Sequence, residues 1–370
     1  MRIGVPKEIK NNEFRVGLVP ASVREYVANG HEVLIETGAG SGIRATDDDY
    51  EVAGAKILPD AASIFSQSEM IIKVKEPQRV EYEQLREGQI LYTYLHLAPD
   101  PEQTEGLVKS GVTAVAYETV TDDHGRLPLL APMSEVAGRL SIQAAAFTLT
   151  APQGGRGLLM GGVPGVLPAK VLVIGGGVVG AHAAKMAAGL GADVTILDRD
   201  QRRLAELDDL FAGRVKTRYS TFEALDEETD SADVVVGAVL IPGASAPKLV
   251  TRDMLKGMKN GAVLVDVSID QGGCFETSKA TTHADPTYSV EGVIHYCVAN
   301  MPGAVPRTSS FALNNATLRQ GLALANKGTD ALKADSHLRN GLNVHRGMVT
   351  YQAVADAIGS DFVEPLTALG

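Results

Sequence analysis

Short apolar runs alternate with longer helix-like segments over most of the chain. In the first third, the apolar runs cover residues 2–5, 31–36, 70–74, 89–95 and 112–117. Segments such as 21–29 and 101–110 lie between these runs and are long enough to form crossover helices. This alternation is typical of βαβ units, and it predicts a parallel sheet covered by helices.

A second alternating region follows a cluster of glycine and proline at residues 152–170. Its apolar runs cover residues 171–175, 193–197, 214–219, 233–237, 262–267 and 293–298. Six runs with helical patterns between them predict a complete doubly wound sheet. From Ser309 to the end the pattern is helical and predicts no further strand. This last segment is too short to fold alone, so we expect it to pack on one of the two sheets.

Length and composition agree with this α/β reading and exclude several functions. A chain of 370 residues suits two domains, because a domain typically has about 100 to 200 residues. The 45 Asp and Glu outnumber the 34 Lys and Arg, which gives a net charge of −11 and disfavours nucleic acid or an anionic lipid surface as a partner. The longest stretch without a charged residue, 140–155, is shorter than the roughly 20 apolar residues of a membrane span.

The N-terminus and the cysteines predict a cytoplasmic protein. Charges at residues 2, 7, 8, 10, 13 and 15 leave no apolar core for a signal peptide. Cys274 and Cys297 are too few for a disulfide framework and do not form a metal-binding pair, so we expect both to be small buried side chains.

One motif predicts a dinucleotide site. Gly175, Gly177 and Gly180 form a G-x-G-x-x-G pattern directly after the run 171–175, and a helix-like segment follows them. In this setting the glycines permit a tight turn, a close approach of backbone to a pyrophosphate, and close packing of the helix. The phosphates would lie at the N-terminus of that helix.

An acidic residue at the end of the next apolar run bears on the choice of cofactor. Asp198 lies 18 residues beyond Gly180, where a carboxylate accepts hydrogen bonds from the adenosine ribose and repels a 2′-phosphate. The sequence therefore favours NAD over NADP, although Arg199 and Arg203 lie close by. A glycine-rich connection followed by a surface aspartate is the structural alternative.

Polar residues that follow the apolar runs are candidates for chemistry, because ligands of open α/β sheets bind beyond the carboxyl ends of the strands. In the first region these residues are Lys75, His96 and Glu118, with Arg15 in the connection after the first run. In the second region they are Asp198, Ser220, Asp270 and Asn300, and the apolar Val239 follows the run 233–237. Arginine and lysine suit the carboxylate and carbonyl of a small 2-oxo acid. Histidine suits proton transfer. The alternatives are solvated loop cations, a structural Glu118, and an Asp270 that only starts a turn.

Four segments resemble blocks of one known family. The stretch GVPKEIKNNEFRVGLVP at 4–20 resembles the N-terminal signature of alanine dehydrogenases and of the NAD-binding subunit of proton-pumping transhydrogenase. The stretch VIGGGVVGAHAAKMAAGLGADVTILD at 173–198 is similar to the second signature. The segments DVSIDQGGCFETS at 266–278 and HYCVANMPGAVPRTSS at 295–310 also resemble family blocks. The resemblance covers essentially the whole chain and is closer to the alanine dehydrogenases.

The resemblance implies a reaction and four residue roles. Arg15 and Lys75 correspond to the substrate-binding arginine and lysine, and His96 and Asp270 to the catalytic histidine and aspartate. The implied reaction is the reversible oxidative deamination of L-alanine to pyruvate and ammonium, with hydride transfer to NAD. The alternative is a non-catalytic NAD-binding subunit that passes hydride to a partner, as in transhydrogenase. A third reading is a dehydrogenase for a larger amino acid, which needs a roomier pocket.

The resemblance also implies domain boundaries, an assembly and a cofactor site. It predicts a homohexamer whose subunits contain a Rossmann domain at 129–306 and a discontinuous Rossmann-like substrate domain at 1–128 plus 307–370. Some relatives hold a metal with a glutamate and a histidine; here the counterparts are Glu118 and Lys327, so we expect no metal. Besides the three glycines, the implied cofactor contacts are Ser134, Val178, Val179, Asp198, Arg203, Ser220, Val239, Leu240, Val267, Ser268, Ile269, Asp270, Lys279, Val298, Ala299, Asn300 and Met301.

Overall fold

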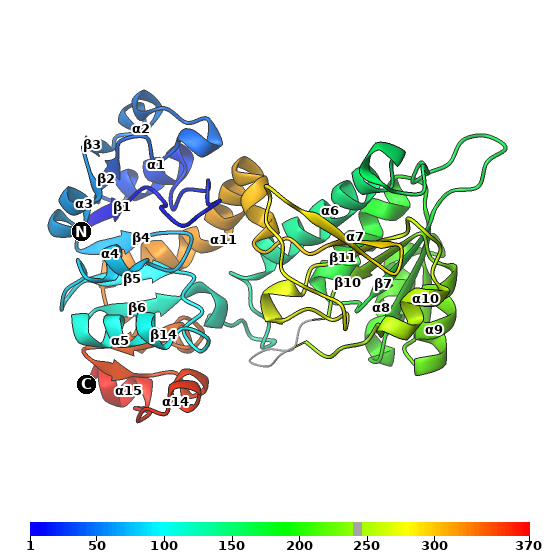
Figure 1. Ribbon diagram of the computed structural model, residues 1–370. Helices are drawn as coiled ribbons and strands as arrows, with labels where there is room; N and C mark the ends of the chain where they lie inside the picture. The colour runs from blue at the N-terminus through cyan, green and yellow to red at the C-terminus, as the bar shows by residue number, and fades with distance from the viewer. Residues whose placement is uncertain (240–245) are drawn as a thin grey trace. The chain divides into compact units, whose positions relative to one another are not determined.

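The computed structural model describes residues 1–239 and 246–370, and the chain divides into two compact units. Unit 1 consists of Met1–Met133 and Gly303–Gly370, and unit 2 consists of Ser134–Pro302. Each unit has its own sheet with helices packed on it (Figure 1). The predicted fold class, two α/β domains with largely parallel sheets, is therefore confirmed.

The sheet of unit 1 has the strand order β15-β14-β6-β5-β4-β1-β2-β3 among the described residues. Strands β1 to β6 run parallel, and all of them except β3 were predicted from the alternating pattern. The bounds are β1 (Arg2–Val5), β2 (Glu32–Glu36), β3 (Lys56–Leu58), β4 (Met70–Ile72), β5 (Ile90–Thr93), β6 (Thr113–Ala116), β14 (Leu342–His345) and β15 (Met348–Val349).

The C-terminal segment contains strands, so the prediction that none follows Ser309 is wrong. Strand β14 pairs antiparallel with β6 and with β15, which extends the sheet of unit 1. The residues of β14, Leu-Asn-Val-His, give only four positions of alternation, which is a weak strand signal by itself. Pairing with the edge of β6 makes this run a strand. Strand β3 was missed for the same reason, because it has only three residues.

The helices of unit 1 follow the segments between the strands, and their ends show ordinary capping chemistry. In α5, for example, Asp100 accepts the backbone N–H of Gln103, Pro101 occupies the first turn, and Gly111 ends the helix with a φ of 71°. The helices are α1 (Pro20–Ala28), α2 (Asp47–Val52), α3 (Ala61–Gln67), α4 (Arg79–Tyr82), α5 (Pro101–Ser110), α11 (Pro306–Lys327), α12 (Asp330–Ala334), α13 (Ser336–Arg339), α14 (Gln352–Ile358) and α15 (Pro365–Leu369), with short 3₁₀ turns at Ser41–Ile43 and Tyr117–Thr119.

Helix α11 ties the C-terminal segment to the loop after β1. Buried Asn314 accepts the backbone N–H of Val19 and donates to the carbonyl of Gly17, at 2.9 and 3.1 Å. Ser310 Oγ accepts the backbone N–H of Val16 at 3.1 Å. The loop that contains Arg15 is therefore held by a helix that lies about 300 residues away in the chain.

The sheet of unit 2 has the strand order β12-β13-β11-β10-β7-β8-β9 within the described part of the chain. The six predicted strands run parallel, and the unpredicted β12 pairs antiparallel with β13 at one edge. The strand order reverses between β7 and β10, where α/β sheets typically bind their ligands. The bounds are β7 (Lys170–Ile174), β8 (Asp193–Asp198), β9 (Lys216–Tyr219), β10 (Val234–Gly237), β11 (Val263–Asp266), β12 (Thr287–Val290) and β13 (Val293–Tyr296).

Small residues let the helices of unit 2 pack closely. Ala183, Ala184 and Ala187 of α7 are fully buried against the sheet. A Cβ on Gly138 of α6 would lie 2.2 Å from the carbonyl oxygen of Val179, so these two helices are in close contact. The helices are α6 (Ala131–Thr148), α7 (Val178–Gly189), α8 (Gln201–Phe211), α9 (Phe222–Ser231) and α10 (Arg252–Gly257), with 3₁₀ turns at Ala151–Gln153, Ile269–Gln271 and Met301–Ala304. No helix in the described residues is long and apolar enough to cross a membrane.

Candidate active site

The glycine motif forms a tight turn between β7 and α7. Gly175 follows β7 with a φ of 98°, in the region that favours glycine. A Cβ on Gly180 would lie 1.8 Å from the carbonyl oxygen of Gly175, so only glycine allows the helix to approach the turn this closely. Gly177, the N-cap of α7, has no neighbouring heavy atom within 4 Å of an added Cβ. Open space therefore borders the N-terminus of α7, which fits a pyrophosphate.

Asp198 and Arg203 hold the glycine turn from two sides. Asp198 ends β8, and its Oδ2 accepts the backbone N–H of Gly176 at 2.6 Å. Arg203 of α8 donates from Nε to the carbonyl oxygen of Gly176 at 2.7 Å and pairs through Nη1 with Glu206 at 2.7 Å. Both residues thus lie beside the glycine turn.

Further predicted cofactor residues lie at the carboxyl ends of neighbouring strands. Ser220 follows β9, and its backbone N–H donates to the carbonyl of Asp198 at 2.9 Å. Val239 follows β10, and its carbonyl accepts the Ser268 hydroxyl at 2.7 Å, which joins the ends of β10 and β11. The fold therefore gathers these residues at the edge that carries the glycine turn. Leu240, another predicted contact, lies outside the described residues.

The remaining predicted cofactor residues have varied settings. Asp270 is exposed in the 3₁₀ turn after β11, and Asn300 has a φ of 58° in the segment after β13. Lys279 is exposed, and its backbone N–H donates to the Tyr288 hydroxyl at 2.7 Å. The others are Ser134 in α6, Val178 and Val179 in the first turn of α7, Val267 and Ile269 beside Ser268, and Val298, Ala299 and Met301 around Asn300.

In unit 1, Arg15 is buried and held by a carboxylate that the sequence analysis did not single out. Glu13 accepts hydrogen bonds from Arg15 Nε at 2.7 Å and from Nη2 at 2.5 Å. Burial opposes the charge of Arg15, but the hydrogen bonds and charge of Glu13 outweigh it and raise the pKa of Arg15. Arg15 Nη1 also lies 3.1 Å from the sulfur of Met133. Arg15 is therefore a charged group in a fixed position. The only sequence signal for the pairing of Arg15 with Glu13 is that the two residues are two positions apart in the same loop.

Lys75 follows β4 and lies in a partly buried acidic setting. Its Nζ is 3.9 Å from Glu76 Oε2, and Glu76 also pairs with Lys10. Burial opposes the charge of Glu76, but Lys75 and Lys10 together lower its pKa. The backbone carbonyl of Lys75 accepts the Thr93 hydroxyl at 3.0 Å, which links it to β5.

His96 lies in an unusual backbone conformation that Glu118 supports. Its φ is 50°, in the left-handed region that non-glycine residues seldom adopt. Glu118 accepts the backbone N–H of His96 at 2.6 Å and that of Leu95 at 3.1 Å. The imidazole stacks on the Tyr94 ring at 5.9 Å, and the side chain is 44% exposed. Glu118 thus fixes the turn while leaving the imidazole accessible to a ligand.

These three residues lie in segments that follow the carboxyl ends of neighbouring strands. Arg15 follows β1, Lys75 follows β4 and His96 follows β5, and these strands are consecutive and parallel in the sheet of unit 1. Arg15 and Lys75 supply two cations that can bind the carboxylate and oxo group of a small oxo acid. The accessible imidazole of His96 can protonate it.

A metal at Glu118 has no support from the neighbouring residues, and its absence stays a prediction. Both oxygens of Glu118 accept backbone N–H groups. Lys327, at the place of the relatives' histidine, is exposed at the end of α11. Across residues 1–239 and 246–370, no three His, Cys, Asp or Glu side chains form a group that could hold a metal.

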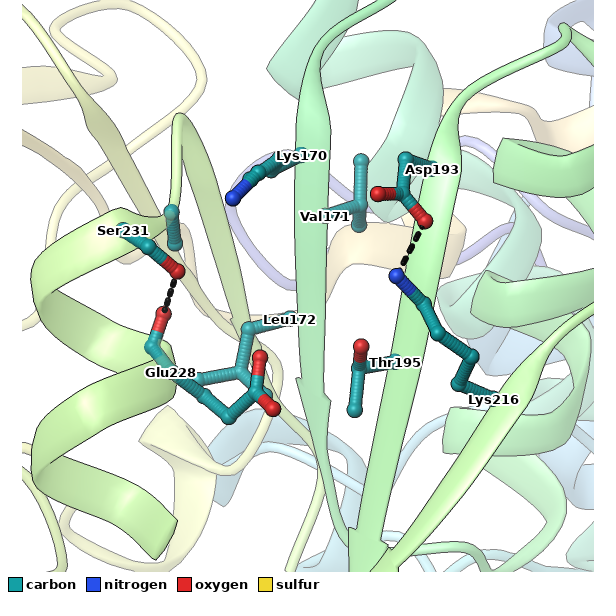
Figure 2. Close-up of a pocket in the computed structure, with 9 residues that line it drawn as sticks. Lys170, Val171, Leu172, Asp193, Thr195, Lys216, Glu228 and Ser231 are labelled. Carbon is teal, nitrogen blue, oxygen red and sulfur yellow. Dashed lines mark hydrogen bonds and ion pairs between the residues drawn. The ribbon is translucent and has the colours of Figure 1, made fainter.

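A small cleft in unit 2 lies away from the nucleotide edge. The lining residues Lys170, Asp193 and Lys216 (Figure 2) begin β7, β8 and β9. The glycine turn follows the other end of β7. Lys216 Nζ pairs with Asp193 Oδ1 at 2.5 Å across it. The cleft therefore lies at the amino ends of the strands, opposite the carboxyl ends that carry the glycine turn, and is not part of the candidate site.

Comparison with known proteins identifies the family. The model described as "Alanine dehydrogenase/PNT, N-terminal domain" matches residues 4–137, and "Alanine dehydrogenase/PNT, C-terminal domain" matches residues 141–352. The chain belongs to the alanine dehydrogenase/PNT family. This confirms the resemblance seen in the sequence. It also implies a nicotinamide dinucleotide cofactor and small-molecule substrates, and the glycine turn of unit 2 fits such a cofactor.

Curated family relatives are similar over nearly the whole chain. An alanine dehydrogenase of Halomonas elongata is 58% identical over 371 residues and covers 100% of both chains. One from Mycolicibacterium smegmatis is 54% identical, with 98% of each chain covered. Among solved structures, an L-alanine dehydrogenase is 53% identical with a TM-score of 0.94, over 97% of this chain and 99% of the other. A transhydrogenase from Sinorhizobium meliloti is 27% identical with a TM-score of 0.81, over 95% and 100%.

Proposed function

We propose that this protein is an alanine dehydrogenase that converts L-alanine, NAD and water reversibly into pyruvate, ammonium, NADH and a proton. The relatives named above support this assignment, as does the greater similarity to an L-alanine dehydrogenase structure than to a transhydrogenase structure. The observation that carries it is that Arg15, Lys75 and His96 lie in the segments that follow the carboxyl ends of three adjacent strands.

Each of these residues has a role that its surroundings suit. Arg15, charged and held by Glu13, binds the substrate carboxylate. Lys75 holds and polarises the oxo group of pyruvate, and it faces the corresponding amino carbon in the deamination direction. The accessible His96 transfers protons to and from the substrate when water adds to the imine or, in the reverse direction, ammonia adds to the carbonyl of pyruvate. The exposed Asp270 orients that nucleophile and balances the cationic intermediate.

The residues of the glycine turn would hold the cofactor in unit 2. A bound nicotinamide dinucleotide supplies the acceptor for the hydride that leaves the substrate Cα. The N-terminus of α7 would bind the pyrophosphate, and Asp198 would meet the adenosine ribose. We propose NAD over NADP because the Asp198 carboxylate repels a 2′-phosphate. We include the other cofactor contacts implied by the resemblance in this proposal. We also propose that the protein forms a homohexamer and is cytoplasmic.

A coupled pair of assays tests the function. NADH formation is measured with L-alanine and NAD, and NADH consumption with pyruvate, ammonium and NADH; NADP and lysine-type substrates serve as comparisons. Activity in both directions, with a strong preference for NAD, is the expected result. Silence in both directions with intact NAD binding would contradict the proposal and favour the hydride-passing subunit. A His96→Gln protein with near-normal turnover would remove the role given to His96.

A further inference from the structure

Unit 1 contains a buried charge cluster that the proposed chemistry does not use. Lys73, directly after β4, has a fully buried side chain. Its Nζ donates to Glu8 Oε2 at 3.0 Å and to Glu81 Oε1 at 2.7 Å. Glu8 lies in the loop after β1, and Glu81 lies in α4, so the cluster joins three segments of the chain.

The cluster gathers ionisable side chains at a place where burial disfavours charge. Burial opposes the ammonium of Lys73, but the two carboxylates outweigh burial and raise its pKa above the usual value. Burial is also the main cause that raises the pKa of Glu8. Buried ion pairs of this kind often contribute no more stability than apolar side chains of similar volume. The other contacts of the two carboxylates, which are with backbone N–H groups, indicate a role besides stability.

The second oxygen of each glutamate holds a different piece of backbone. Glu8 Oε1 accepts the N–H of Val74 at 2.7 Å and lies 3.4 Å from the N–H of Lys75. Glu81 Oε2 accepts the N–H of Gln78 at 2.7 Å, at the start of α4. The two carboxylates are thus matched in burial and in their bond to Lys73. They differ in the backbone that they hold: Glu8 binds the segment of Lys75, and Glu81 binds the start of α4.

The segment of Lys75 is also fixed from its carbonyl side. The Tyr117 hydroxyl donates to the carbonyl of Lys73 at 3.1 Å, and the Thr93 hydroxyl donates to the carbonyl of Lys75 at 3.0 Å. Strand pairing continues past β4, since the N–H of Lys73 donates to the carbonyl of Tyr92 at 3.2 Å. Glu8 therefore completes a set of bonds that surrounds the peptide groups of residues 73–75.

We propose that Glu8, braced by Lys73, is a positioning residue that fixes the backbone of Lys75 and so aims its amine at the substrate. This inference rests on the proposed function for the role of Lys75. Without the bond to Lys73, the Glu8 carboxylate could turn away from the backbone of residues 74 and 75. The buried lysine thus serves the site through Glu8, and it does not itself meet the substrate.

The test compares Glu8→Gln with Glu81→Gln. A glutamine has one oxygen and one amide nitrogen, so it cannot accept from both Lys73 and a backbone N–H as the carboxylate does. In Glu8→Gln the side chain must lose either its hydrogen bond from Lys73 Nζ or its hydrogen bond from the backbone N–H of Val74. Glu81→Gln makes the same chemical change in the same cluster, but the backbone bond at risk lies at the start of α4. Glu8→Asp, which keeps two oxygens, is the conservative variant.

Two measurements decide the proposal. We expect kcat/KM for L-alanine to fall about 10- to 100-fold in Glu8→Gln, since a displacement of about 1 Å costs that much, and to recover in part in Glu8→Asp. In Glu81→Gln the folded enzyme should stay within about threefold of the wild type. Hydrogen exchange of the peptide that covers residues 73–76, measured without ligands, should speed up in Glu8→Gln and not in Glu81→Gln.

Each outcome supports or overturns the inference. Equal losses of activity in both variants, with equal exchange at residues 73–76, would show a merely structural ion pair and overturn the proposal. Normal kcat/KM in Glu8→Gln would overturn it as well. If the wild-type protein showed no alanine-dependent activity, the proposed function would fall. The exchange data would still decide whether Glu8 fixes the backbone. If Glu8→Gln did not fold, Glu8→Asp would be compared with Glu81→Asp by the same measurements.

Discussion

At the scale of single residues, the side chains expected to meet the substrate are held by carboxylates. Arg15 is gripped by Glu13, the Lys75 segment by Glu8, and the left-handed turn of His96 by Glu118. Such bonds reduce the freedom of a charged or reactive group before the substrate arrives, which lowers the entropy lost on binding.

The pairing of Glu13 with Arg15 yields a prediction about substrate affinity. Glu13→Gln removes the charge and one of the two acceptors, so the guanidinium loses its fixed orientation. We expect the KM for L-alanine and pyruvate to rise about 10- to 100-fold, as the loss of a charge-assisted hydrogen bond worth roughly 1.5–3 kcal/mol implies. The expected change in kcat is smaller. Steady-state kinetics measure the split, and NAD affinity should not change.

The control for this variant is Glu83→Gln. Glu83 also pairs with an arginine, Arg79, but both side chains are well exposed on the surface. Exposed pairs of this kind contribute little, so the kinetics should stay at the wild-type values. A KM in Glu13→Gln equal to that of this control would contradict the role of Glu13.

At the scale of elements, the turn between β7 and α7 links local sequence to cofactor binding. Its two outer glycines are needed for the turn itself, because Gly175 has a positive φ and Gly180 contacts the backbone of Gly175. The middle glycine has a different role, since a Cβ at Gly177 would meet no protein atom. Its space is therefore available to a ligand.

Gly177→Ala separates folding from cofactor binding. The added methyl group fits the ligand-free protein, so we expect a melting temperature within about 2 °C of the wild type, in line with the small effect of an unstrained surface change. The same methyl group would block the approach of the pyrophosphate, so NAD affinity should fall at least about tenfold. Calorimetric titration with NAD and thermal unfolding measure the two effects.

Gly189→Ala is the matched control at the other end of α7. A Cβ at Gly189 also meets no atom within 4 Å, but this position ends the helix far along the chain from the turn. NAD binding should therefore be unchanged in Gly189→Ala. Tight NAD binding by Gly177→Ala would show that the pyrophosphate does not lie at this turn.

Strand β13 contains a buried histidine that predicts a pH dependence of stability. His295 is fully buried, with Nδ1 3.1 Å from the carbonyl of Val293 and Nε2 2.7 Å from the Thr277 hydroxyl. Burial lowers its pKa below the ordinary value of 6.5, so the unfolded chain binds a proton more readily than the folded one. The contribution of His295 is thus present above pH 6.5 and is lost as the pH falls below it.

Urea unfolding between pH 8 and pH 5 measures this effect. We expect the free energy of unfolding of the wild type to fall with acidification, and to fall less steeply in His295→Gln, where no imidazole titrates. Identical slopes for the two proteins would show that His295 does not contribute to the pH dependence.

At the scale of the whole molecule, unit 1 is built from two distant parts of the chain. Residues 303–370 add β14 and β15 to the sheet and, through α11, hold the loop that contains Arg15. Buried Asn314 makes the central contacts to Val19 and Gly17. The site of unit 1 therefore depends on residues 303–370 as well as on the N-terminal part of the chain.

Asn314→Ala tests this dependence, with Asn315→Ala as the control. The first change leaves a buried N–H and a buried carbonyl without partners, at about 1–3 kcal/mol each, so we expect the free energy of unfolding to fall by about 2–4 kcal/mol. Asn315 is the next residue in the same helix but is exposed, so its replacement should change stability by less than about 0.5 kcal/mol. Equal urea midpoints for the two variants would contradict the anchoring role.

Local signals in the sequence determined the glycine turn, the acidic residue beyond it and most of the parallel strands. The runs that form β5, β6, β10 and β11 are buried on both faces, and the backbone conformation at Gly175 needs glycine whatever the rest of the chain does. The same signals identified Lys75 and His96, since each follows an apolar run directly, and Arg15, which lies in the connection after the first run. The roles of these residues stay predictions.

Only the tertiary structure decided what holds these residues. Strand β14 forms because an edge of β6 is available to it, which four alternating residues cannot indicate. Glu8 and Lys73 are 65 positions apart, and Asn314 and Val19 are 295 apart, so no local pattern could pair them. A periodic pattern reports which residues are buried, whereas the partner of a buried charge depends on which segments the folded chain brings together.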